Sequence, residues 1–137
     1  MMAANEDQLK EKYLALQMLA GKMKQIEAQV QAVSERLAQI REVEDSLDEL
    51  KAAKAGSEAL VPVSEGIFVK AAIKDTASLI VNVGSGVCVE KTPEQTKELL
   101  NQRVSELAAH RTQLIAELEM QAMQADKLET ELSKLSR

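Results

Sequence analysis

The sequence predicts an α+β protein in which two long helices form an antiparallel coiled coil, with two β-hairpins inserted at the bend between them. Three observations carry this prediction. Both ends of the chain repeat apolar residues with heptad spacing, the middle is rich in valine and glycine, and cap and turn residues mark the boundaries. We assign residues 1–56 to the N-terminal helix, 57–91 to the hairpins and 92–137 to the C-terminal helix, all in one domain.

The N-terminal helix is predicted by apolar residues at alternating steps of three and four. A repeat of about 3.5 residues keeps one side of a helix facing a partner, which is the condition for a coiled coil. We expect Asn5 or Asp7 to cap its start and Gly56 to end it in a left-handed conformation. The stripe consists of Leu16, Leu19, Met23, Ile26, Val30, Val33, Leu37 and Ile40, extended by Leu9 and Leu47, with Lys12 and Glu44 as polar interruptions.

The middle segment changes to residues that favour strands. It holds seven of the chain's eleven valines, and β-branched side chains suit the pleated surface of a sheet. Apolar and polar residues alternate there, and short turns that contain glycine separate four runs. We therefore expect two β-hairpins, at residues 60–74 and 78–91. Pro62 is expected at a sheet edge or at the start of its strand, because it has no amide proton.

The C-terminal helix is predicted to begin at the sequence TPEQ. Thr92 is the expected cap, Pro93 suits the first helical position, and Gln95 stands three residues after the cap. Nine of the eleven residues in the stripe that follows are apolar. The stripe consists of Leu100, Val104, Leu107, Arg111, Leu114, Leu118, Gln121, Ala125, Leu128, Leu132 and Leu135.

The two helices are expected to pair with each other. Their similar lengths favour an antiparallel pair within one chain, since the middle segment supplies the reversal of direction, but pairing between chains fits the same pattern. Two hairpins without a covering helix leave apolar faces and unpaired edges in water. We therefore expect other subunits to complete the hairpins through Val61, Val63, Ile67, Val69, Ile73, Leu79, Val81, Val83, Val87 and Val89.

Composition argues against several classes of function. The net charge of -5 and the pI near 5.0 disfavour nucleic acid as a partner. No apolar run approaches the roughly 20 residues that cross a bilayer, and the N-terminus lacks the apolar segment of a signal peptide. A single cysteine rules out an internal disulfide. We expect a cytoplasmic protein with no membrane or nucleic-acid partner.

The sequence contains no recognisable catalytic, metal or cofactor constellation. His110 is the only histidine and lies mid-helix without a second ligand or base. Cys88 alternates with valines on a predicted strand, far from any base that would activate it. The glycines of VGSGV are not followed by the lysine and serine or threonine of a phosphate loop. We therefore expect a protein that is not an enzyme and that carries no cofactor or metal.

Extra apolar residues lie beside the coiled-coil stripes near the ends of the chain. Soft, flexible methionine side chains suit surfaces that accept many sequences. Such residues beside a heptad repeat also occur where they only widen the seam between two helices. The candidate residues for binding other proteins at this tip are Tyr13, Leu14, Leu16, Met18, Met120, Met123, Leu128 and Leu132.

The middle segment resembles the α-class subunits of prefoldin, a cytosolic chaperone of archaea and eukaryotes. The similarity lies in an LVP strand at residues 60–62, the pattern G-x-F/Y-V-K-A at 66–71, IKDT at 73–76, V-x-V-G-x-G-V at 81–87 and VEKT at 89–92. Individual residues match over about 33 positions, and the order of helix, strands and helix matches over the whole chain. The heptads alone are shared by many unrelated proteins.

The resemblance implies a specific assembly and function. In this family two α and four β subunits join their hairpins into an intersubunit double β-barrel, from which six coiled coils extend. The tips hold unfolded client proteins and pass them to a group II chaperonin without ATP. The expected partners are therefore β-class subunits, unfolded clients and that chaperonin.

Other interpretations fit parts of the sequence. A structural coiled-coil scaffold shares the heptads but needs no apolar tips. An accessory subunit of an enzyme predicts one stable catalytic partner in place of many clients. A prefoldin-like protein that assembles as a homo-oligomer needs no separate β subunit.

Overall fold

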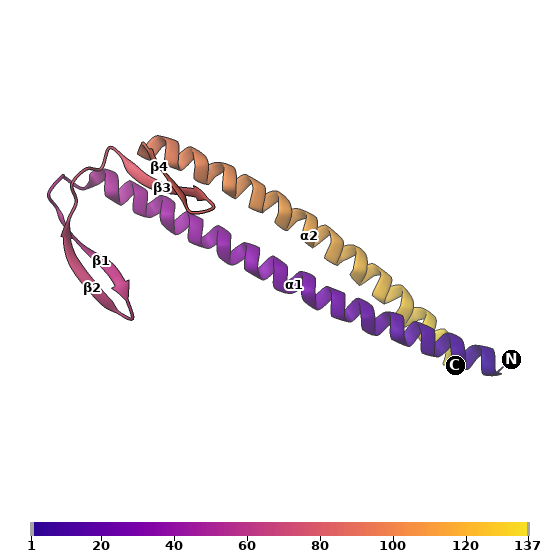
Figure 1. Ribbon diagram of the computed structural model, residues 1–137. Helices are drawn as coiled ribbons and strands as arrows, with labels where there is room; N and C mark the ends of the chain where they lie inside the picture. The colour runs from indigo at the N-terminus through magenta and orange to yellow at the C-terminus, as the bar shows by residue number, and fades with distance from the viewer. Residues whose placement is uncertain (1, 137) are drawn as a thin grey trace. The chain divides into compact units, whose positions relative to one another are not determined.

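The computed structural model describes residues 2–136 and contains two long helices and four strands (Figure 1). The helices are α1 (Met2–Ala52) and α2 (Pro93–Leu135), and the strands between them are β1 (Glu58–Ser64), β2 (Ile67–Ala72), β3 (Leu79–Gly84) and β4 (Val87–Lys91). This arrangement confirms the predicted order of elements. The chain divides into two compact units: the coil unit holds the residues up to Leu37 with those from Glu106 onward, and the hairpin unit holds Ala38–Ser105.

Within the coil unit, α1 and α2 pair in antiparallel directions. Arg111 donates a hydrogen bond from Nε to Ser34 Oγ at 2.9 Å, and Lys12 reaches Glu131 at 2.8 Å. Moving toward the N-terminus on α1 therefore means moving toward the C-terminus on α2. The seam between the helices is built from the predicted stripes: Ile26, Val33 and Leu114 are buried, and Val30, Leu37, Leu107 and Leu118 pack against them.

The start and the end of α1 differ from expectation. The helix is already formed at Met2, so Asn5 and Asp7 lie inside it and the prediction that one of them caps it was wrong. Ala3 and Ala4 stand directly before Asn5. Because alanine is the strongest helix former, they favour a helix that begins before Asn5. At the other end the helix stops at Ala52, four residues before Gly56.

Gly56 does adopt the predicted left-handed conformation, but in a turn beyond the helix. Its φ is 90°, and Ser57 N donates to Lys54 O at 3.1 Å across it. A glycine with positive φ in the third position is what a type II turn requires. Gly56 N also donates to Ile73 O, which ties the turn to the end of the first hairpin.

The start of α2 has the predicted capping box. Thr92 N donates to Gln95 Oε1 at 3.0 Å, and Gln95 N donates to Thr92 Oγ1 at 3.1 Å. These reciprocal bonds satisfy two backbone donors at the helix start. Pro93 occupies the first helical position and is buried.

The two hairpins form separate two-stranded antiparallel sheets, β1–β2 and β3–β4. Val61 pairs with Val69 in the first sheet, and Val81 pairs with Val89 in the second. The second hairpin therefore has the same register as the first, shifted by twenty positions along the chain. Each has an irregularity in its first strand just before the turn. Both turns have two residues with positive φ, Glu65–Gly66 and Ser85–Gly86, as in the type I′ turns that suit twisted hairpins.

The helical part of the hairpin unit is held by apolar residues and ion pairs. Its buried apolar residues are Ile40, Leu47 and Leu100. Lys51 lies 3.2 Å from Glu94, and Lys97 pairs with Asp48. The bond from Lys97 lowers the pKa of the Asp48 carboxyl and raises that of the Lys97 ammonium, so each stays charged over a wider pH range.

Candidate functional site

The hairpins expose most of the residues that sequence reasoning assigned to subunit contacts. Ile73, Leu79 and Val81 are half-buried. The exposed members are Val61, Val63, Ile67, Val69, Val83, Val87 and Val89, with relative exposures between 36% and 63%. Groups of exposed large apolar side chains of this kind mark sites of interaction.

Three large apolar residues of the hairpins were missed by the sequence analysis. Leu60, Phe68 and Ile80 are exposed by 66%, 55% and 68%. Phe68 stands opposite Pro62, and Leu60 stands opposite Lys70, so they lie on the face of β1–β2 opposite to that of Val61 and Val69. The first hairpin therefore has apolar residues on both faces. Their apolar side chains could have identified them in the sequence. They were omitted because the sequence analysis assumed that only one face of each hairpin contacts other subunits.

The hairpins are tied to the rest of their unit at few points. Ile73 N donates to Ser57 O at 2.9 Å, which extends the pairing at the base of the first hairpin. Arg103 Nη2 lies 3.5 Å from Asn82 O, at the edge of the second hairpin. These polar links leave the apolar side chains of the strands open to solvent.

The second surface lies at the outer part of the coil unit. Five predicted tip residues are well exposed, while Leu16, Leu128 and Leu132 are half-buried along the seam. The exposed five and their exposures are Tyr13 60%, Leu14 61%, Met18 65%, Met120 64% and Met123 73%.

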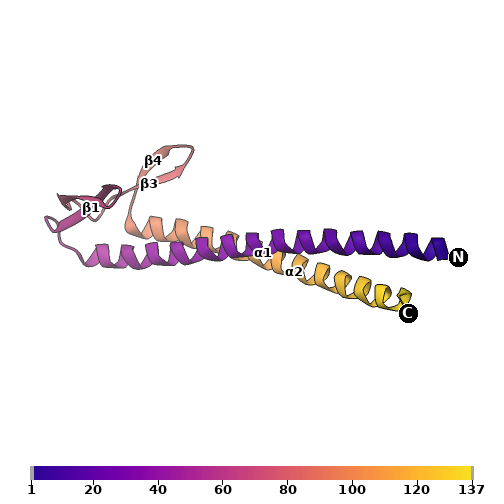
Figure 2. The ribbon, with the colours of Figure 1, turned by 90° about the horizontal axis from the view of Figure 1, so that it is seen from below.

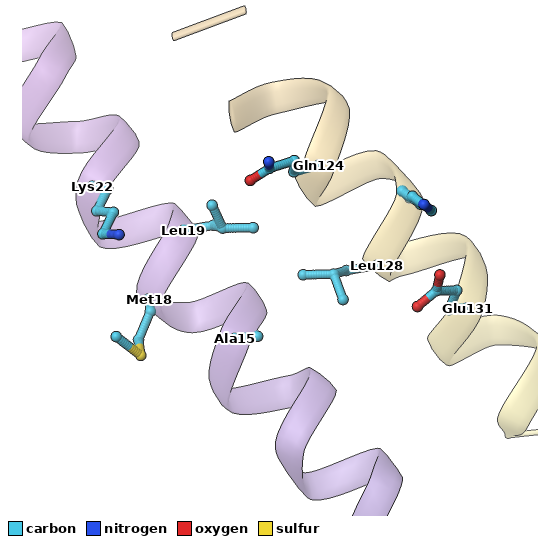
Figure 3. Close-up of a pocket in the computed structure, with 8 residues that line it drawn as sticks. Ala15, Met18, Leu19, Lys22, Gln124, Leu128 and Glu131 are labelled. Carbon is cyan, nitrogen blue, oxygen red and sulfur yellow. The ribbon is translucent and has the colours of Figure 1, made fainter. Parts of the chain in front are cut away.

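Two grooves run beside the seam in this region, each between α1 and α2. The first, which we call the lysine groove, has a volume of about 450 Å³ and is lined by Gln124 and by two groups of residues. We call its apolar lining residues the floor (Ala15, Met18, Leu19 and Leu128) and its charged lining residues the rim (Lys22, Lys127 and Glu131). In Figure 3 the side chains of Leu19 and Leu128 point toward one another across it.

The second groove has a volume of about 510 Å³, and we call it the acidic groove. Its apolar lining includes Tyr13, Leu16 and Met23 from α1, and its charged residues are Asp126 and Glu129 from α2. The tip therefore offers apolar surface at two places along the seam.

The ion pair at the tip links the two helices directly. Lys12 Nζ donates to Glu131 Oε2 at 2.8 Å. This bond lowers the pKa of the Glu131 carboxyl, with smaller contributions from the charges of Lys12, Lys127 and Lys134. The predicted polar interruption at Lys12 is thus used to join α1 to α2.

Packing along the seam weakens toward the tip. The most distal buried apolar residues are Ile26 on α1 and Leu114 on α2, and farther out the seam residues are only half-buried. Figure 2 shows the free ends of α1 and α2 lying at the same end of the helix pair. Gln121 marks this change: its Oε1 is buried and has no hydrogen-bond partner among the described residues.

Within residues 2–136, the side chains offer little for catalysis or metal binding. Cys88 is an exposed free thiol on β4 and His110 is exposed on α2. Over this range there is no group of three or more acidic, histidine or cysteine side chains arranged to hold a metal ion. None of the described helices combines the length and apolar character needed to span a membrane.

Comparison of the chain with known proteins points to one family. The family model described as "Prefoldin subunit" matches residues 5–137. A prefoldin subunit alpha from Thermofilum pendens is 32% identical over 107 residues, covering 78% of this chain and 81% of the relative. A prefoldin subunit alpha from Methanosarcina acetivorans is 33% identical over 127 residues, covering 85% of this chain and 89% of the relative.

A solved structure shares the fold at low sequence identity. The cryo-EM structure of filamentous PFD from Methanocaldococcus jannaschii has a TM-score of 0.80, covers 87% of this chain and 98% of its own, and is 19% identical. At this identity the likeness concerns the fold: two long helices joined by hairpins.

Proposed function

The chain belongs to the prefoldin family, as an α-class subunit, and on this basis we propose that it acts in an ATP-independent chaperone hexamer. In this assembly the whole chain is one subunit, residues 57–91 join it to the other subunits, and the coiled-coil tip captures unfolded proteins. The captured client passes to a group II chaperonin in the cytoplasm.

The exposure of the hairpins supports the assembly step. Seven of the ten proposed contact residues are exposed by 36% to 63%, and groups of exposed large apolar side chains mark sites of interaction. The strands also leave their outer edges without backbone partners, and such edges pair readily with other strands. Two β-hairpins of this chain, combined with those of four β-class subunits and a second α subunit, give each apolar face and edge a partner.

The tip supports the capture step, and its exposed methionines carry the proposal. Met18, Met120 and Met123 are exposed by 64% to 73%, where a coiled coil that only paired its helices would have polar residues. Flexible thioether side chains adapt to different apolar partners. Each contact is weak, and several tips that hold one client gain strength through effective concentration.

The test replaces the three exposed methionines by serine. The Met18→Ser/Met120→Ser/Met123→Ser chain is assembled with a β-class partner, and light scattering follows the aggregation of a denatured client. We expect assembly to be unchanged and suppression of aggregation to fall severalfold. Equal suppression by the variant hexamer would refute tip capture by this subunit. Addition of a group II chaperonin to the wild-type complex tests transfer, which predicts recovery of folded client.

A further inference from the structure

The two grooves at the tip differ in the charge of their rims. The lysine groove has Lys22 and Lys127 beside its apolar floor, whereas the acidic groove has Asp126 and Glu129 and no basic residue in its lining. Both grooves are open to solvent and both are largely apolar. The charge of the lining residues is therefore the property by which the two grooves can select different client segments.

The one acidic residue of the lysine groove is already compensated. Glu131 bonds to Lys12 at 2.8 Å, and the charge of Lys127 also lowers the pKa of the Glu131 carboxyl. Lys22 and Lys127 form no ion pair within 4.0 Å in the part of the chain that the structure describes. Since Glu131 is paired with Lys12, the charges of Lys22 and Lys127 are left uncompensated among the lining residues, and the rim has an excess of positive charge.

We propose that the lysine groove selects apolar client segments that carry Asp or Glu next to their apolar residues. This inference rests on the proposed function and names the kind of segment that this face of the tip holds. Met18, Leu19 and Leu128 contact the apolar side chains, and the ammonium groups of Lys22 and Lys127 pair with the carboxylates. Segments that carry lysine or arginine are disfavoured in this groove.

The charges of the rim lysines determine this preference, although the net charge of the whole chain is negative. The chain has a net charge of -5, but charges in water are screened beyond about 8 Å at physiological ionic strength. A docked carboxylate therefore responds to the rim lysines and little to distant acidic residues.

The experiment measures the binding of two short fluorescent peptides to the hexamer by anisotropy. Both peptides have the same apolar core, flanked by two glutamates in one and by two lysines in the other. Charge is reversed on the lysine groove with Lys22→Glu/Lys127→Glu. The matched control, Asp126→Lys/Glu129→Lys, reverses charge on the acidic groove by the same number of residues.

We expect the Lys22→Glu/Lys127→Glu hexamer to bind the glutamate peptide roughly three- to tenfold more weakly than wild type. The lysine peptide should gain affinity in that variant. The control should not weaken binding of the glutamate peptide, because it removes no lysine from the lysine groove, and Lys22→Arg/Lys127→Arg should preserve the wild-type affinity. Since the four charged positions are at the surface of helices, circular dichroism and gel filtration of each hexamer verify folding and assembly.

The outcomes separate this inference from the function on which it rests. If wild type and both charge-reversed hexamers bind the glutamate peptide equally, the charge preference is refuted while apolar capture stands. The same holds if the control weakens glutamate-peptide binding as much as the lysine-groove variant does. If the wild-type hexamer binds neither peptide and fails to suppress aggregation, capture itself is refuted.

Discussion

The helical seam and the hairpins use apolar residues in opposite ways. Ile26, Val33 and Leu114 cover one another within the chain and retain 5% to 9% of their exposure. Val69 and Ile67, on the first hairpin, remain exposed by 50% and 63%. The seam therefore stabilises the fold of a single chain, whereas the hairpins leave apolar side chains exposed. Substitutions in the two regions should affect different measurements.

The largest effect is expected on assembly. A Val69→Lys/Val89→Lys chain places an ammonium group on one apolar face of each hairpin, where a partner subunit would have to bury it without a counter-charge. We expect no hexamer with a β-class partner by native mass spectrometry, and nearly unchanged helix content. Val43→Lys is the matched control, because Val43 is an exposed valine on α1 at 45%. If the double variant formed a hexamer normally, the hairpins could not be part of the subunit interface.

A substitution in the seam should give the reverse pattern. Ile40 is 5% exposed, and truncation of a buried isoleucine to alanine costs about 2–5 kcal/mol. We expect Ile40→Ala to lower the free energy of unfolding in urea by an amount in the lower part of that range, since the seam is narrow. The neighbouring exposed site gives the comparison: Val43→Ala should change stability by less than about 0.5 kcal/mol. Similar losses at both sites would mean that the seam does not provide the stability of the chain.

The smallest effect concerns the ion pair at the tip. Bonding to Lys12 lowers the pKa of Glu131 from its ordinary value of 4.5. A carboxyl whose pKa is lowered by folding stabilises the folded state above its unfolded pKa, and this contribution is lost as pH falls through the folded value. Acidification from about pH 7 to about pH 3 should therefore lower the protection factors of the amides near residue 131, which compare the observed exchange rate with the intrinsic rate at the same pH.

The variant Glu131→Gln isolates the contribution of this pair. It should show faster exchange near residue 131 already at neutral pH, and a smaller change on acidification. Because Asp48 and Glu94 also have lowered pKa values, an acid effect of the same sign is expected in the hairpin unit in both proteins. An unchanged pH dependence at residue 131 in the variant would show that the pair does not stabilise the tip.

Much of the fold was predictable because its signals are local and periodic. Every residue of the α1 stripe from Leu9 to Leu47 is buried or half-buried, including Lys12 and Glu44. The capping box at Thr92 and the turns at Gly66 and Gly86 depend on neighbouring residues, which the sequence displays directly. The α2 stripe had one exception. Arg111 is exposed and bonds to Ser34, since a long guanidinium can leave the seam while its stem stays beside it.

The surfaces were less predictable because they depend on residues distant in sequence. The lysine groove brings Lys22 beside Lys127, and only the register of the two helices fixes which residues meet across the seam. Leu60 and Phe68 were overlooked because alternation identifies two faces of a strand but does not say that both are apolar. The assignment of particular residues to client binding and to subunit contacts stays a prediction.

The unpartnered oxygen of Gln121 has a mechanical consequence. A buried amide oxygen that lacks a hydrogen bond destabilises the packing around it, and Gln121 lies farther out than Leu114, the last buried residue of its helix. Moving the helices apart beyond Gln121 exposes less buried apolar surface than moving them apart at Ile26 and Leu114. The outer end of the pair should therefore open locally at a lower cost in free energy.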